Sequence, residues 1–140
     1  MRILLAVDGS AYTQKMLEYL VSHPNWAAAG NEYTALTVSA PLPPHAAKML
    51  SKDLVADYFE EEAQKVLAPV REFLAGHQVA VQCLSKVGPI GETISRVADE
   101  GGYDLLVMGT RGHGALARLV VGSVATQVLA ASKVPVLLIR

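Results

Sequence analysis

The sequence has a single cysteine, Cys83, so no disulfide can form within the chain and nothing in the cysteine content requires an oxidising compartment. Cys83 lies in a strand-like run, which is typical of a small buried hydrophobic residue rather than a nucleophile. Asp8 interrupts the opening apolar run, and no later stretch is long enough to span a membrane without a charge or a proline. We therefore expect a cytoplasmic protein with no membrane association.

Net charge is also nearly absent. A formal charge of −1 gives no reason to expect nucleic acid or an anionic membrane as a partner. No acidic residue follows Asp104, so the last quarter of the chain is basic and should attract an anion. The basic or ionisable residues of this quarter are Arg111, His113, Arg118, Lys133 and Arg140.

Two common phosphate-binding motifs are missing. No Gly-x-x-x-x-Gly-Lys-[Ser/Thr] occurs, which excludes a P-loop NTPase. No Gly-x-Gly-x-x-Gly follows the first predicted strand, which excludes the usual dinucleotide-binding turn. A phosphate site in this chain would have to be built elsewhere.

Apolar residues are abundant, at 51% against 18% charged residues, which favours elements buried on both faces. The length of 140 residues fits one domain, residues 1–140. Apolar runs between turn-forming residues predict strands at 3–7, 33–38, 79–84, 103–108 and 134–139. Helical spacing predicts helices after Ser10, at about 46–74, from Pro89 to about residue 98, and at 123–131.

Strands that alternate with helices and lack polar alternation indicate a doubly wound, Rossmann-like α/β fold, with helices on both faces of a parallel sheet. Right-handed crossovers make 3-2-1-4-5 the simplest order for five such strands. Strands one and four are then neighbours whose connections leave toward opposite faces, which opens a crevice at their carboxyl ends. The turns that begin at Asp8 and Gly109 should face each other across this crevice.

The connection from residue 109 to residue 123 contains glycines at positions 109, 112, 114 and 122. Glycines let backbone N–H groups turn inward to form a nest for an anion, and a helix that begins at Gly122-Ser123 would point its own free N–H groups into the same loop. Alternatively, the glycines only turn corners and Ser123 is only a helix cap. The length favours an anion site, because connections of about two to six residues are usual here.

Four side chains near the predicted crevice are candidates for binding. Arg111 and Arg118 are phosphate ligands or plain surface charges. His113 has no partner for metal binding or catalysis in the sequence, which leaves loop solvation or a phosphate contact. Asp8 either accepts hydrogen bonds from a ribose hydroxyl or an adenine amino group, or simply forms the turn before Gly9.

The spacing Gly109-x-x-Gly112, then nine residues, then Gly122-Ser123 resembles the ATP-binding signature of universal stress proteins. The similarity covers the whole chain. It includes the opening residues 3–10, the Gly88-Pro89 turn, residues 104–109 and the closing residues 134–139.

The resemblance implies that the chain binds an adenine nucleotide, ATP or AMP, together with Mg²⁺. Asp8 and the backbone at Val38 would hold the adenosine end, and Met108 and Gly109 would flank the ribose and the first phosphates. The residues that would wrap the phosphates are Gly112, Gly122, Ser123 and Val124. Ala125 departs from the family pattern, which often has a hydroxyl there, so the terminal phosphate should be held less tightly.

The family also implies homodimers joined through their last strands. This agrees with the residues themselves, because the apolar strand from Val134 to Ile139 should form an uncovered edge of the sheet.

Three functions fit these features. The first is a nucleotide-binding stress-response or regulatory protein whose conformation or dimer state responds to ATP. The second is a slow ATPase or phosphotransferase, for which the sequence offers only His113 and Asp8 as reacting groups. The third is a dimerisation module of the same fold that binds no nucleotide, and the complete set of glycines argues against it. No residue is assigned as catalytic, and no metal site made by the protein alone is expected.

Overall fold

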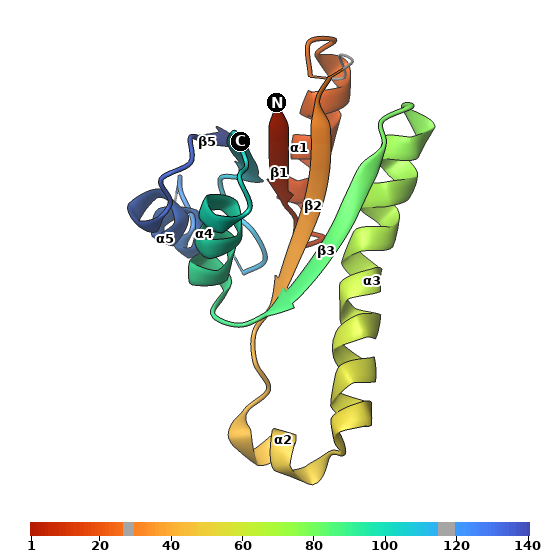
Figure 1. Cartoon of the computed structure of the whole chain (residues 1–140), viewed down its shortest axis with the longest axis vertical. Helices are drawn as coiled ribbons and strands as arrows, with labels where there is room; N and C mark the ends of the chain where they lie inside the picture. The colour runs from red at the N-terminus through yellow and green to blue at the C-terminus, as the bar shows by residue number, and fades with distance from the viewer. Residues whose placement is uncertain (27–29, 115–119) are drawn as a thin grey trace.

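The computed structural model describes residues 1–26, 30–114 and 120–140, in which strands alternate with helices along the chain (Figure 1). The elements are β1 (Arg2–Ala6), α1 (Ala11–Ser22), β2 (Glu32–Ser39), α2 (Pro44–Met49), α3 (Lys52–Gly76), β3 (Val81–Val87), α4 (Ile90–Glu100), β4 (Leu105–Gly109), α5 (Ser123–Ala131) and β5 (Val136–Ile139).

The five strands of the described residues form one parallel sheet in the order β3-β2-β1-β4-β5, which confirms the predicted fold class and strand order. β1 lies at the centre, where Leu5 pairs with Ala35 of β2 and with Val107 of β4. All three residues are fully buried, because helices cover both faces of the sheet.

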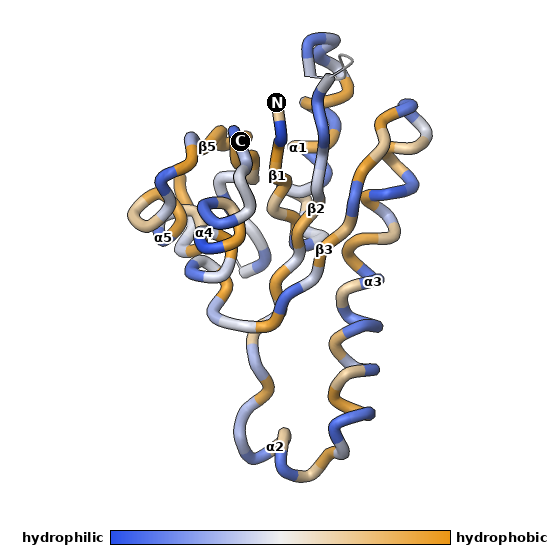
Figure 2. The backbone as a smooth tube through the Cα atoms, viewed as in Figure 1, coloured by the Kyte–Doolittle hydropathy of each residue, from blue (hydrophilic) through white to orange (hydrophobic). Residues whose placement is uncertain are grey.

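The core is divided into two layers by the sheet. Successive side chains of a strand point to opposite faces, so Ile3 and Leu5 pack in a cluster with α1 and α3, whereas Leu4 packs with α4 and α5. β1 is therefore apolar after Arg2, as Figure 2 shows. No helix in the described ranges is both long enough and apolar enough to cross a membrane.

The single helix expected at about 46–74 is wrong, because two helices, α2 and α3, occupy this segment. Ser51 separates them: its backbone is extended, and its Oγ accepts a hydrogen bond from Leu54 N at 3.2 Å, which caps α3. α2 and the first turns of α3 extend past the carboxyl ends of the strands (Figure 1).

The third, fourth and fifth strands each begin two residues later than expected, and hydrogen bonds account for the third and the fifth. Val79 N donates to Leu74 O at 2.9 Å and so closes the turn that follows α3. Val134 N donates to Asp99 Oδ1 at 3.3 Å and to Ser132 Oγ at 3.2 Å. In both places the N–H group completes a turn and is not available to a sheet.

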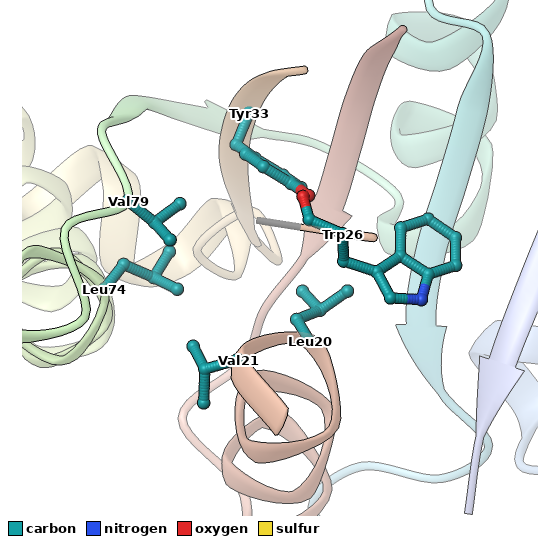
Figure 3. Close-up of a pocket in the computed structure, with 6 residues that line it drawn as sticks. All are labelled: Leu20, Val21, Trp26, Tyr33, Leu74 and Val79. Atoms are coloured by element: carbon teal, nitrogen blue, oxygen red, sulfur yellow. The ribbon is translucent and has the colours of Figure 1, made fainter. Parts of the chain in front are cut away.

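A small apolar pocket of about 10 Å³ lies at the amino-terminal end of the sheet, between α1 and α3 (Figure 3). Its lining residues are Leu20, Val21, Trp26, Tyr33, Leu74 and Val79. The Tyr33 hydroxyl already donates to the Trp26 carbonyl oxygen. A space of this size holds about one water molecule, so the pocket is a gap in packing and not a ligand site.

Replacing Leu106 by Ala should lower the free energy of unfolding by about 2–5 kcal/mol, because this fully buried side chain of β4 fills the layer under α4 and α5. The matched control is Leu129→Ala on α5, where the side chain is 49% exposed and the change should stay below about 0.5 kcal/mol. Urea unfolding measures both. Equal losses for the two variants would contradict the described core.

Candidate functional site

A cleft of about 540 Å³ opens at the carboxyl ends of β1 and β4, where the connections of these neighbouring strands leave toward opposite faces. Sites for small molecules usually measure about 300–1,000 Å³. Arg118 lies outside the described residues. The ten residues named as binding candidates that line the cleft are Asp8, Val38, Met108, Gly109, Arg111, Gly112, His113, Gly122, Ser123 and Val124.

The turn after β1 fixes the carboxylate of Asp8. Gly9 has a φ of +75°, a conformation that favours glycine, and it brings Ser10 N to 2.9 Å from Asp8 Oδ1. Thr13 Oγ1, in the first turn of α1, donates to the same oxygen at 2.9 Å and accepts from Asp8 N at 3.0 Å. Ser10 caps α1, as expected, by accepting from Thr13 N. Asp8 Oδ2 is left facing the backbone of Gly112.

Asp8 is ionised at neutral pH. Burial by itself would raise the pKa of its carboxyl, but the hydrogen bonds from Ser10 and Thr13 and the charge of His113 outweigh burial, so the pKa lies below its ordinary value. The cleft therefore has a fixed negative charge at the tip of β1.

The loop after β4 comes close to this carboxylate. A Cβ atom on Gly112 would overlap with Asp8 Oδ2, so only glycine lets the loop backbone lie there without displacing Asp8. On the other side of the same turn, His113 Nε2 lies 2.7 Å from the Asp8 carbonyl oxygen. The turns after β1 and β4 thus face each other across the cleft.

The amino terminus of α5 is open toward the loop. Gly122, not Ser123, is the N-cap residue, so the interpretation of Ser123 as a helix cap is wrong. No side chain from the described residues caps this helix, because glycine has none to offer. Gly122 N donates to Thr110 O at 2.7 Å, which brings the two ends of the loop together. An uncapped helix end of this kind attracts anions.

Several cleft residues were not foreseen from the sequence. The more prominent ones are Thr13, Thr37, Ser39, Glu62, Val66, Ile90 and Ile94. Thr37 and Ser39 could have been predicted, because they occupy the carboxyl end of β2 beside β1. The residues of α3 and α4 could not, since their positions depend on how each helix docks on the sheet.

The cleft has apolar walls and few carboxylates. Ile90, Ile94 and Met108 supply apolar surface, and Ala125, only 2% exposed, lies at the floor of the α5 side. In addition to Asp8, the cleft is lined by one other carboxylate among the described residues, that of Glu62, whose Oε1 lies 2.8 Å from Lys65 Nζ. Within residues 1–26, 30–114 and 120–140, no group of three or more His, Cys, Asp or Glu side chains could hold a metal ion.

The family model of the universal stress proteins matches residues 1–140 of this chain. The chain belongs to the universal stress protein family. Universal stress protein Slr1230 from Synechocystis sp. is 33% identical over 139 residues, which are 99% of this chain and 42% of that protein. A universal stress protein from Thermus aquaticus is 31% identical over 144 residues, with 99% of this chain and 97% of that protein covered. The chain spans about half or less of some family members and nearly all of others.

Solved structures of family members have the same fold. The protein MJ0577 of Methanocaldococcus jannaschii matches with a TM-score of 0.83 at 24% identity, over 99% of this chain and 94% of that one. An Arabidopsis thaliana family member with AMP bound matches with a TM-score of 0.70 at 14% identity, over 99% and 90% of the two chains. A universal stress protein in complex with cAMP matches with a TM-score of 0.67 at 21% identity, over 100% and 96%.

Replacing Asp8 by Asn should flatten the pH dependence of stability in acid. Because the pKa of Asp8 is lowered by folding, its contribution is fully present above the unfolded-state pKa, about 3.9, and is lost as pH falls through the lower folded-state pKa. Urea unfolding of both proteins from pH 6 to pH 2 measures this. The native protein should lose more stability below about pH 4 than Asp8→Asn, and parallel curves would contradict the described hydrogen bonds.

Proposed function

We propose that the chain binds an adenine nucleotide, ATP or alternatively AMP, in the cleft between the Asp8 turn and the glycine loop, and acts as a stress-response or regulatory protein. The observation that carries this proposal is the uncapped amino terminus of α5 opposite a fixed carboxylate in one cleft. The first suits phosphate, and the second suits hydroxyl and amino groups.

The phosphate end of the nucleotide would lie against the glycine loop. Backbone N–H groups at Gly112, Ser123 and Val124 are the proposed donors, with the positive end of the α5 dipole behind them. The N–H group of Gly122 is bonded to Thr110 O, so Gly122 would contribute by letting the backbone approach the phosphates closely. Ser123 is exposed, and its hydroxyl is not used for capping. Ala125 offers no hydroxyl, so the terminal phosphate would depend on these groups and on Arg111 and His113.

The adenosine end would lie between β2 and β4. Asp8 Oδ2, which none of the hydrogen bonds of the turn uses, can accept from a ribose hydroxyl. The backbone at Val38 would meet the adenine edge, while Met108, Ile90 and Ile94 give the ring an apolar bed. Met108 and Gly109 would flank the ribose.

Mg²⁺ would enter with the nucleotide. It is usually held by one or two carboxylates together with phosphate oxygens and water, so it requires no cage made by the protein. With Asp8 at the ribose end, phosphate oxygens and water would supply most of the Mg²⁺ ligands in this cleft. Bound Mg²⁺ would neutralise phosphate charge.

The relatives support an adenine nucleotide. The Arabidopsis thaliana protein has AMP bound, and another family member forms a complex with cAMP. Both molecules contain the adenosine and one phosphate, which are the parts that the Asp8 turn and the glycine loop would hold here.

Hydrolysis of ATP is less well supported than binding. His113 Nε2 is engaged with the Asp8 carbonyl oxygen at 2.7 Å, and Asp8 Oδ1 is engaged with Ser10 and Thr13. A general base must reach the water that attacks the terminal phosphate, and in the proposed arrangement Asp8 Oδ2 lies at the ribose end instead. Steady-state turnover that is abolished by His113→Ala would favour an enzyme instead.

Gly112→Ala should weaken ATP binding by roughly tenfold to a hundredfold, because the new Cβ would overlap with Asp8 Oδ2 and displace the carboxylate. Calorimetric titration with ATP and Mg²⁺ measures the affinity. Gly76→Ala is the matched control, since no atom lies within 4 Å of a Cβ there. If neither the native protein nor the control produces heat or a thermal shift with ATP, the nucleotide proposal fails and the dimerisation module remains.

We further propose a homodimer through β5. Pro135 O accepts a hydrogen bond from Leu106 N of β4, and Ile139 O accepts one from Thr110 N, directly after β4. The backbone groups of alternate residues of a strand point to opposite sides, so those of Val136 and Leu138 point to the open edge. Native mass spectrometry should give twice the chain mass, with bound nucleotide in the same spectrum. A monomer at tens of micromolar would contradict pairing through this edge.

A further inference from the structure

Arg111 carries a charge that the described part of the chain does not neutralise. It belongs to neither of the ion pairs found there, and the sequence has no acidic residue after Asp104. Its Nε is buried and has no hydrogen-bond partner among the described residues. A buried donor without a partner is costly, and an unneutralised guanidinium group on a cleft-lining residue is suited to bind an anion.

The ring of Tyr12 contacts the Arg111 guanidinium. Arg111 Cζ lies 5.0 Å from the ring centroid, within the range of a cation–π interaction. The first turn of α1 that carries Tyr12 is pressed against β4, since a Cβ on Gly109 would come within 2.7 Å of Tyr12 Cβ. Because Tyr12 is held in place there, its ring can restrict the many rotamers of the Arg111 side chain.

The stem of Arg111 passes beside the amino terminus of α5. A Cβ on Gly122 would lie 3.3 Å from Arg111 Cα and 3.7 Å from Arg111 Cγ. Gly122 is the N-cap of α5, and its N–H is bonded to the carbonyl of Thr110, the residue before Arg111. Arg111 thus starts beside the uncapped helix end and reaches the Tyr12 ring with its guanidinium group.

We propose that Tyr12 is a positioning residue for nucleotide binding, whose ring holds the Arg111 guanidinium beside the phosphate end of the cleft. The inference rests on the proposed nucleotide site and adds a residue that does not line it. Tyr12 acts through Arg111, so its effect on affinity must grow with the number of phosphates and vanish for adenosine.

The test compares ATP, AMP and adenosine by calorimetric titration of the native protein, Tyr12→Leu, Tyr12→Phe, Arg111→Leu and the double variant. Tyr12→Leu should weaken ATP binding roughly 3- to 30-fold, weaken AMP binding less, and leave adenosine binding unchanged. Tyr12→Phe keeps the ring face and should retain native affinity. In the Arg111→Leu background, the additional loss from Tyr12→Leu should disappear.

The matched control is Tyr19→Leu. Tyr19 lies on the same helix, is also partly buried, and stacks on His23 at 4.0 Å, away from the cleft. Lys15, whose Nζ lies 5.1 Å from the Tyr12 ring centroid, is tested by Lys15→Ala, which should leave ATP affinity unchanged. Circular dichroism melts identify variants that do not fold. If Tyr12→Leu does not fold, Tyr12→pentafluorophenylalanine replaces it. This side chain keeps the shape of phenylalanine but reverses the electrostatic character of the ring face, so it should weaken ATP binding relative to Tyr12→Phe.

The outcomes separate this inference from the proposed function. If the native protein binds none of the three ligands, the proposed function fails and the role of Tyr12 fails with it. If the native protein binds ATP but Tyr12→Leu and pentafluorophenylalanine leave the ATP-to-adenosine affinity ratio unchanged, only the inference is overturned. An effect of Tyr12→Leu that persists in the Arg111→Leu background, or that is equal for all three ligands, also overturns it.

Discussion

The structure depends on the contact between the Asp8 carboxylate and the backbone of Gly112. The strand order makes β1 and β4 neighbours. The turns at their carboxyl ends then come so close that a Cβ atom on Gly112 would overlap with Asp8 Oδ2. Hydrogen bonds from Ser10 and Thr13 fix the Asp8 carboxylate. Gly112 has no side chain, which allows its backbone to lie against that carboxylate. The cleft has its position and its width because of this approach.

The two sides of the cleft differ in electrostatic character. The side of β1 presents an ionised carboxylate, whereas the side of α5 presents a helix terminus that no side chain of the described residues caps. A ligand with hydroxyl groups at one end and negative charge at the other matches this polarity. Glycine at the N-cap position keeps the helix end open, since Ser or Asp there would satisfy the same N–H groups internally.

The sequence predicted the features that follow from the order of strands and helices along the chain. It did not predict the features that depend on local hydrogen bonds or on how the helices pack on the sheet. Strand order and the meeting of Asp8 with the glycine loop follow from alternating strands and helices, so the sequence predicted the lining residues at the ends of β1 and β4. The break before α3 was missed because apolar spacing continues through Ser51, and the cap that overrides it is a local hydrogen bond. Glu62 and the stacking of Arg111 on Tyr12 were missed because they depend on where helices lie on the sheet.

The division of the core into two layers has a mechanical consequence. The layer under α1 and α3 and the layer under α4 and α5 are separate clusters of buried residues on opposite faces of the sheet, so local opening of one need not disrupt the packing of the other. Asp8 precedes α1, and Ser123 begins α5, so the cleft reaches into both layers. A molecule bound to both residues would couple the two layers of the core, because opening of either layer would have to break its contacts with that molecule.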